Sequence, residues 1–310
     1  MPVRLGLGLP QQKSFNIGRD IPMVAKAAED IGYDSVWVFE RILFPEPATQ
    51  GLYNIPGLPW PDAYRSVADP LVTLSMAAAA TERVQLGTSV LVASLHVPFQ
   101  LARTLATLDN ASGGRVIAGF GTGWSHDEYA AASVAPFERR GEVLDELLDV
   151  CAAVWGPDPV SFKGALTTIA LSEVGPKPAR PIPVRLPATN APTLRRVVDR
   201  ADGWMPVALD AADLAAQWQK LQAIAAERGR ERPISVTLRA NAIWTADRFD
   251  GENRQPFQGN VEQMVEDAVR FTQAVPVTDL LIDLNGSLPT AQQVTDTAAE
   301  LHNALRAAGV

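Results

Sequence analysis

The sequence predicts an α/β protein built as a single (β/α)8 TIM barrel over residues 1–310, with insertions after the second strand and before the fifth. Short β-branched runs alternate eight times with longer segments whose apolar residues recur at helical spacing. The composition shows no break typical of a linker, and 310 residues suffice for a barrel of about 250 residues plus insertions. An open, doubly wound sheet is the alternative that this alternation also allows.

The expected elements follow from the same periodicity. Strands are expected at 4–9, 35–39, 84–92, 115–119, 183–187, 203–207, 235–243 and 279–284. Helices are expected at 20–31, 69–80, 98–110, 137–155, 191–201, 211–228, 261–274 and 290–308. Asp69-Pro70 places a capping carboxylate before a proline at the first helical position, and Gly32 and Gly229 stand just past helix ends.

Two connections are too long to be plain loops. The segment 40–68 contains five prolines and the aromatic residues Phe44, Tyr53, Trp60 and Tyr64, a content that argues against disorder. Because it follows a barrel strand, we expect it to form a lid or pocket wall over the C-terminal mouth of the barrel. The segment 157–181 is the second insertion, and we expect it to fold over a face of the barrel.

Composition excludes several classes of function. A net charge of −8 without a run of Lys or Arg argues against nucleic acid and anionic membranes as partners. The single cysteine, Cys151, lies in an apolar helical pattern, so we expect a buried, inert thiol and a cytoplasmic protein. No segment has the layout of a signal peptide or the ~20 apolar residues that span a bilayer. The three histidines lack metal-ligand spacing, and the motifs of acyl transfer and nucleotide hydrolysis are missing, so no metal site is expected.

Glycines stand at the end of one expected strand and inside another. The segment 119–124 reads Gly-Phe-Gly-Thr-Gly-Trp, and alternating glycines there either let the backbone approach a ligand or simply mark a turn. Gly87, inside the third strand, indicates a bulge, a close ligand or a tight barrel corner. Glu40-Arg41, at the end of the second strand, is a candidate site pair, although without further context a simple ion pair is the favoured explanation.

These segments resemble the bacterial luciferase-like monooxygenase superfamily in order and spacing over roughly residues 3–204. The resemblance rests on Leu86-Gly87-Thr88-Ser89-Val90, Pro98, Leu101-Ala102-Arg103, Thr107-Leu108-Asp109, Ser112-Gly113-Gly114-Arg115, Gly119-x-Gly-x-Gly-Trp124, Asp127-Glu128-Tyr129, Arg140-Gly141-x-x-Leu144-Asp145-Glu146, Trp155-Gly156 and Pro176-Lys177-Pro178. Three further segments resemble one branch of this superfamily, the probable oxidoreductases that depend on coenzyme F420, a deazaflavin. They are Glu40-Arg41-x-Leu43-Phe44-Pro45, Pro59-Trp60-Pro61 and Asp69-Pro70-Leu71.

The resemblance implies a (β/α)8 barrel that binds FMN or F420 at its C-terminal mouth. It implies a bulge with a non-prolyl cis peptide at Ser89-Val90 behind the cofactor ring, and an acidic residue, Glu40, against the ring system. Thr122 and Asp127 fall where the rim meets the polar chain of the cofactor. The cofactor-binding residues implied as a set are Glu40, Ser89, Val90, Val92, Gly121, Thr122, Gly123, Asp127, Thr189 and Asn190.

The chain also departs from the family pattern. Arg41 stands where many deazaflavin members place a proton-donating histidine, and an arginine cannot donate a proton at neutral pH. Thr189 and Asn190 follow the fifth strand where a glycine pair usually admits the cofactor phosphate. Trp124 replaces an acidic residue of a branch that oxidises sugar phosphates, so that substrate class is not expected. The acidic net charge disfavours an acidic cofactor tail unless Arg239, Arg254 or their neighbours form a local basic patch.

The expected function is hydride transfer between coenzyme F420 and a small, fairly apolar organic substrate, in a homodimer. The expected catalytic residues are Arg41, which would stabilise negative charge, Glu40 or His96, which would shuttle a proton, and Trp124 in the pocket wall. One alternative is an FMN-dependent monooxygenase that uses O2 with a partner flavin reductase. A second is a non-catalytic, cofactor-binding subunit.

Overall fold

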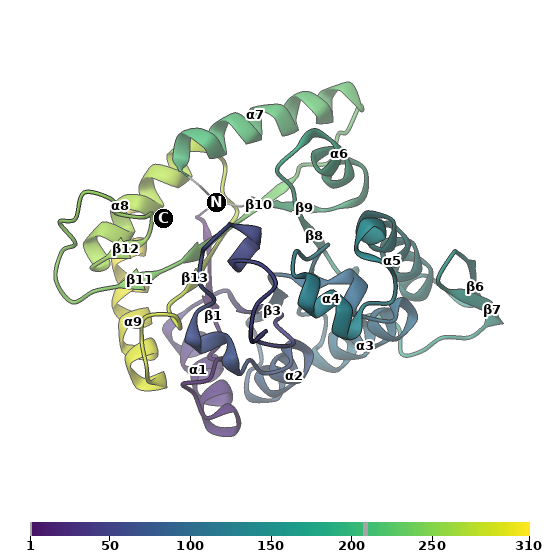
Figure 1. The fold of residues 1–310 in the computed structure, drawn as a ribbon, viewed down its shortest axis with the longest axis horizontal. Helices are drawn as coiled ribbons and strands as arrows, with labels where there is room; N and C mark the ends of the chain where they lie inside the picture. Colours follow the sequence, from purple (N-terminus) through teal and green to yellow (C-terminus); the bar gives the residue numbers. More distant parts are fainter. Residues whose placement is uncertain (1, 207–209) are drawn as a thin grey trace.

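The structure is a computed structural model that describes residues 2–206 and 210–310, and it is a closed barrel of parallel strands (Figure 1). The strands are β1 (Arg4–Gly8), β2 (Ser35–Val38), β3 (Gln85–Thr88) with its continuation β4 (Leu91–Val92), β5 (Val116–Gly121), β8 (Val184–Pro187), β9 (Gly203–Met205), β10 (Ser235–Asn241) and β13 (Asp279–Asp283). Each pairs in parallel with the next, and β13 pairs with β1, so the ring closes. The predicted barrel is confirmed, and the open sheet is excluded.

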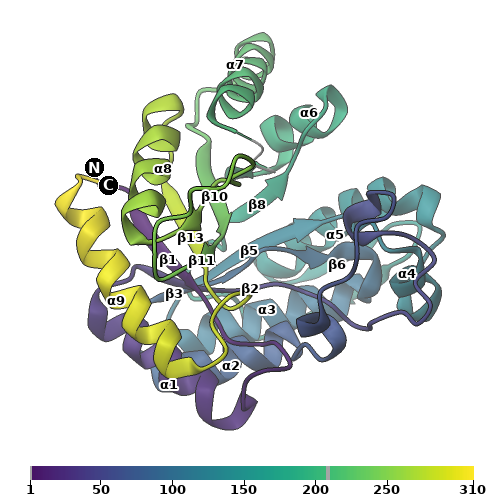
Figure 2. The same ribbon diagram turned by 60° about the vertical axis from the view of Figure 1, so that its left-hand side comes forward.

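Eight helices in this part of the chain surround the strands in the order that the sequence predicts (Figure 2). They are α1 (Ile17–Ile31), α2 (Pro70–Ala80), α3 (Pro98–Ser112), α5 (Arg140–Trp155), α6 (Ala191–Arg200), α7 (Ala211–Glu227), α8 (Val261–Ala274) and α9 (Ala291–Ala307). The capping signals act as expected: the Asp69 carboxylate accepts from the first free N–H groups of α2, and Gly32 ends α1 with φ of 111°. Cys151 is buried in α5 as a free thiol.

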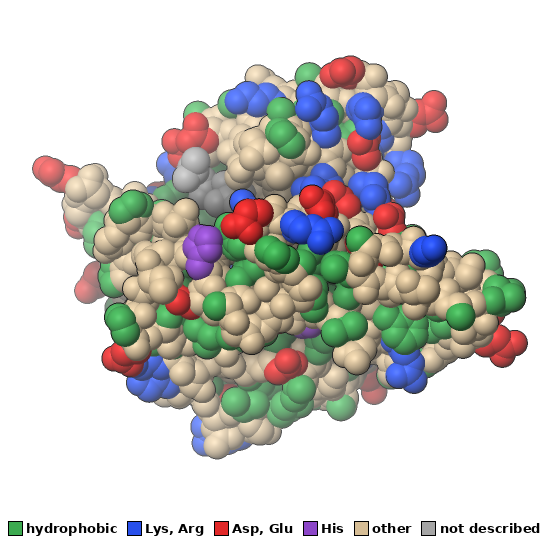
Figure 3. Space-filling view, turned by 45° about the vertical axis from the view of Figure 1, so that its right-hand side comes forward, with side chains coloured by type: hydrophobic (Ala, Val, Ile, Leu, Met, Phe, Trp, Pro, Cys, Tyr) green, Lys and Arg blue, Asp and Glu red, His purple; other side chains and the backbone are tan. Residues whose placement is uncertain are grey.

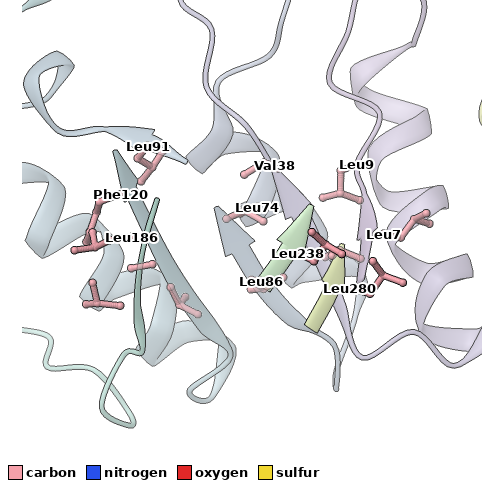
Figure 4. Close-up of a cluster of buried hydrophobic side chains, with 14 of the residues drawn as sticks. Leu7, Leu9, Val38, Leu74, Leu86, Leu91, Phe120, Leu186, Leu238 and Leu280 are labelled. Atoms are coloured by element: carbon pink, nitrogen blue, oxygen red, sulfur yellow. The ribbon is translucent and has the colours of Figure 1, made fainter. Parts of the chain in front are cut away.

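The core lies mainly between the strands and the helices. Figure 4 shows leucines of the barrel wall, among them Leu7, Leu86 and Leu238, packed in this layer. A separate cluster around Trp37, which includes Ile117, Met205 and Leu281, fills the inside of the barrel, with Val90 packed against it. The barrel interior is therefore solid below its mouth.

Several predicted boundaries are wrong. The expected strand 84–92 is broken between Thr88 and Leu91, and the expected strand 115–119 runs on to Gly121. The strand expected at 203–207 ends at Met205, and Val207 lies outside the described residues. The elements that the sequence did not predict are α4 (His126–Ala132), the antiparallel pair β6 (Val160–Lys163) and β7 (Thr168–Ser172), and the short pair β11 (Ile243–Trp244) and β12 (Gln258–Gly259).

The second insertion folds as the β6–β7 hairpin at the edge of the molecule, beside α5 (Figure 1). Glu146 of α5 holds its turn, because the two carboxylate oxygens accept the N–H groups of residues 165–167 at 2.7–3.1 Å. The expectation that this segment covers a face of the barrel is corrected: it packs against an outer helix.

The break between β3 and β4 is a bulge with a cis peptide at Ser89-Val90, as the family resemblance implies. Gly87 pairs with Ile117 and Leu91 with Phe120, so the bulged strand has one residue more than β5 over this stretch. The Thr88 hydroxyl bridges the gap: it donates to the Gly119 carbonyl at 2.9 Å and accepts from the Gly119 N–H at 2.8 Å.

The alternating glycines of β5 make room for this bulge. A Cβ at Gly119 would lie 1.9 Å from the Thr88 carbonyl oxygen, one at Gly121 would lie 2.6 Å from Val90 Cγ2, and one at Gly123 would lie 2.6 Å from Val92 Cγ1. The glycine spacing therefore serves a close approach of two strands. Gly87 has a similar role, because a Cβ there would lie 2.3 Å from the Trp37 ring.

Replacing Gly119 with alanine should lower the free energy of unfolding by about 3 kcal/mol or more, because backbone atoms of the bulge would have to move. Gly286→Ala is the matched control, since a Cβ at Gly286 has nothing within 4 Å, and its change should stay within about 0.5 kcal/mol. Urea unfolding followed by tryptophan fluorescence measures both. Equal stability of the two variants would contradict this role of the glycine.

Candidate functional site

The C-terminal ends of the strands bring most of the predicted residues to one mouth. Glu40 follows β2, Ser89 to Val92 form the bulge, and Gly121 to Gly123 lie at the end of β5 and just after it. The segment 40–68, drawn in dark blue, crosses in front of the strands in Figure 1 and forms the expected lid. Thr189 and Asn190 stand beyond the end of β8, at the start of α6.

Glu40 and His96 form a hydrogen-bonded pair at the edge of the bulge. One oxygen of the Glu40 carboxylate lies 2.8 Å from His96 Nε2, and the other accepts the Val92 N–H at 2.6 Å. The Glu40 side chain is 2% exposed and that of His96 is 20% exposed. An ionised carboxylate only accepts hydrogen bonds, so Glu40 orients the imidazole with Nε2 toward it.

Arg41 is held in a buried ion pair that the sequence did not predict. Its guanidinium donates to Glu128 of α4 at 2.7 Å, and the side chains are 9% and 4% exposed. The second Glu128 oxygen accepts the Ile42 N–H at 2.9 Å. Burial raises the pKa of the Glu128 carboxyl, while Arg41 and the Ile42 N–H partly offset this rise.

Aromatic side chains surround the Arg41 guanidinium. It lies 4.8 Å from the Trp124 ring centre, 5.5 Å from that of Trp60 and 6.0 Å from that of Tyr64. Trp60 and Trp124 also pack on each other, with ring centres 5.1 Å apart. The Arg41 guanidinium is thus enclosed between the lid and the rim of the barrel.

Further hydrogen bonds fasten the lid to the start of α4. Asp127 accepts from the N–H and the hydroxyl of Thr49 at 3.1 and 2.9 Å. Gln50 donates to the Trp124 carbonyl and accepts the His126 N–H. Asp127, predicted to contact the cofactor, therefore holds the lid in this structure. The sequence Ser125-x-x-Glu128 was a signal for this short helix, since Ser125 caps it, but it did not reveal the partner of Glu128.

Arg239, on β10, occupies the centre of the mouth. It donates to the Ser89 carbonyl at 2.6 Å, to Asp283 at 2.7 Å and to Asn241 at 2.8 Å, and it lies over the Phe39 ring. The sequence suggested Arg239 only for a basic patch, because the contact with Ser89 joins residues 150 positions apart.

Thr189 and Asn190 have a capping role in α6. Asn190 Oδ1 accepts the Thr193 N–H at 3.1 Å, and Thr193 Oγ1 accepts the N–H groups of both residues. Together with Lys220 of α7 they line a hollow between α6 and α7. This hollow offers one cationic side chain and a helix N-terminus, which together suit a phosphate.

A flavin or deazaflavin ring fits the polar groups at the centre of the mouth. The hollow there has no room for a water molecule in this structure, and it is lined by Gly8, Trp37, Val38, Phe39, Arg239, Leu281 and Asp283. Arg239 supplies N–H donors to this hollow, and Asp283 supplies carboxylate acceptors. A flat ring with carbonyl oxygens and N–H groups matches this set. Side chains around the hollow would have to move to admit a ring, among them Tyr64 of the lid, which packs on Phe39.

Residues 2–206 and 210–310 contain neither a metal-binding cluster nor a membrane-spanning helix. In this part of the chain no three His, Cys, Asp or Glu side chains are grouped to hold a metal ion. Nor does it contain a helix of the length and apolar character that a membrane span needs. On the face drawn in Figure 3, acidic and basic side chains are interspersed. Two ion pairs, Arg196–Asp145 and Arg200–Asp149, join α6 to α5.

Residues 5–303 match the family described as luciferase-like monooxygenase, so the chain belongs to this family. An uncharacterised protein of Mycobacterium tuberculosis is 34% identical over 214 residues, which are 67% of this chain and 74% of that protein. An F420-dependent glucose-6-phosphate dehydrogenase of Amycolatopsis mediterranei is 31% identical over 191 residues, 60% of this chain and 53% of that enzyme.

Solved structures share the fold over nearly the whole chain. An F420-dependent secondary alcohol dehydrogenase with a bound F420-acetone adduct has a TM-score of 0.78 at 20% identity, covering 99% of this chain and 100% of that one. The oxygenating constituent of a Baeyer-Villiger monooxygenase of Pseudomonas putida, in complex with FMN, has a TM-score of 0.73 at 15% identity, covering 97% and 98%. At these identities the likeness concerns the fold. Membership of the family places the chain among the luciferase-like oxidoreductases and monooxygenases.

Replacing Arg41 with alanine should lower the free energy of unfolding by about 3–5 kcal/mol, because Glu128 would stay buried without its partner. The double variant Arg41→Met, Glu128→Gln should recover most of this loss, since it removes both charges and keeps an acceptor for the Ile42 N–H. Urea unfolding of the single and double variants gives the comparison. A double variant as unstable as the single one would show that the pair is not the cause.

Proposed function

We propose that the protein is an F420-dependent oxidoreductase that transfers a hydride between the deazaflavin and a small, fairly apolar organic substrate. The observation that carries this proposal is the Glu40–His96 pair beside the bulge. Oxidation of an alcohol to a ketone, or the reverse, moves a hydride and a proton together. A positioned imidazole with a carboxylate behind it is suited to take up or supply that proton.

Other residues of the mouth would position the cofactor and the substrate. When bound, the deazaflavin supplies the hydride-accepting carbon. The bulge from Ser89 to Val92 forms the wall behind the ring, while Glu40 fixes the bulge through the Val92 N–H. His96 exchanges the substrate proton at Nδ1. Trp60 and Trp124 cover the substrate with apolar surface and exclude water, and Arg41 holds them in place.

The ends of the cofactor would be held further along the rim. Thr122 and Gly123 stand between the bulge and α4, where the polar chain of the cofactor would pass. Thr189, Asn190 and Lys220 would hold its phosphate in the hollow between α6 and α7. Asp127 would contact the polar chain only when the lid releases it.

An FMN-dependent monooxygenase is the second candidate, because the family and its fold include FMN-binding oxygenases. The Glu40–His96 pair argues for hydride transfer over oxygen chemistry, since it supplies the proton that a carbonyl–alcohol conversion needs. The same pair argues against a subunit that binds the cofactor without reacting.

Titration of the purified, cofactor-free protein with F420 and with FMN tests the proposal. We expect F420 to bind more tightly and to quench the fluorescence of Trp60 and Trp124, which lie over the mouth. Variant Trp124→Phe should bind F420 with a smaller change in fluorescence, which ties the signal to this site. Preferential binding of FMN would favour the oxygenase, and binding of neither would overturn the proposal.

A further inference from the structure

We propose that Arg239 is the residue that stabilises the negative charge of the reduced cofactor ring, with Asp283 setting how strongly it does so. This inference rests on the proposed function only in requiring a flavin or deazaflavin in the mouth. Transfer of a hydride to a neutral ring adds two electrons and one proton, so the ring becomes an anion until a second proton arrives. A cation fixed beside the ring therefore favours the reduced form.

The position of Arg239 is fixed from three sides. Nε donates to Asn241, Nη1 to the Ser89 carbonyl and Nη2 to Asp283, and the guanidinium lies 5.3 Å from the Phe39 ring centre. These contacts come from β10 itself, the bulge and β13, so the side chain is oriented before any ligand binds. Preorganised donors of this kind need no rearrangement when charge develops.

Arg239 retains a donor for a ligand. Guanidinium has five N–H groups, and Nη2 donates one of its two to Asp283. For the other, the described residues provide no acceptor, and the side chain, 21% exposed, lines the hollow at the centre of the mouth. The Ser89 carbonyl that Arg239 binds belongs to the bulge behind the proposed ring position. The Arg239 guanidinium thus lies next to the bulge and to the hollow proposed for the ring.

Asp283 determines how much positive charge remains at this point. Its Oδ2 lies 2.7 Å from Arg239, and its Oδ1 accepts from the Asn285 N–H and Nδ2. A carboxylate this close offsets most of the field of the guanidinium. Removing the carboxylate should therefore have the opposite effect to removing the cation. The other charges of the mouth are paired elsewhere, Arg41 with Glu128 and Glu40 with His96.

The test compares the affinities of the oxidised and the reduced cofactor, measured under anaerobic conditions by equilibrium titration. For Arg239→Gln we expect the ratio of Kd for the oxidised form to Kd for the reduced form to fall about tenfold, the effect of losing one charge-assisted hydrogen bond. For Asp283→Asn we expect this ratio to rise. Arg196→Gln, which breaks a comparable Arg–Asp pair between α5 and α6, should leave it unchanged.

A merely structural role of Arg239 predicts something different. Loss of packing would weaken both cofactor forms equally, and Asp283→Asn would then change the ratio in the same direction as Arg239→Gln or not at all. Either result would overturn the inference. If the protein binds FMN and not F420, the proposed function fails while the same ratio, measured with FMN, still decides the role of Arg239. Binding of neither cofactor would overturn both proposals.

Discussion

The site depends on the close approach of β5 to the bulge between β3 and β4. The bulge inserts one extra residue, and the two strands stay together because the Thr88 hydroxyl bonds both backbone groups of Gly119. Side chains at residues 119, 121 and 123, at the end of β5 and just beyond it, would prevent this approach, and all three residues are glycine. The result is a strand whose carbonyl at Ser89 and N–H at Val92 are turned to Arg239 and Glu40 instead of to a neighbouring strand. The chemistry of the mouth is built on this wall.

The lid is the second level of the site. It is joined to α4 by the Arg41–Glu128 pair and by the contacts of Thr49 and Gln50. The aromatic side chains of the lid lie above the mouth of the barrel. Closure of the lid therefore also excludes water from the mouth. Opening requires the separation of a buried ion pair, which is costly in an apolar surrounding. A barrier of this kind would suit the proposed hydride transfer, because it would keep water out of the site.

The fold could be predicted from the sequence because each βα unit repeats the same local pattern, and local patterns decide which residues form strands and helices. Glu40 and His96 could be placed at the mouth because each follows a strand of the barrel, whereas the bulge at Ser89-Val90 was expected only from the family resemblance. The partner of Arg41 could not, since Glu128 lies 87 positions away and its position depends on how the lid folds. The structural role of the alternating glycines could not be predicted from the sequence either. A glycine makes room for a ligand and for a neighbouring strand in the same way, so the residue type does not distinguish the two roles.

A crystal structure of the protein with bound F420 is the most direct test of the central claim, that the bulge from Ser89 to Val92 is the wall of a cofactor site. The account predicts the deazaflavin ring against Val90, within hydrogen-bond distance of Arg239, with the lid aromatics displaced from their present positions. A ring bound away from the bulge, for example in the hollow between α6 and α7, would contradict it.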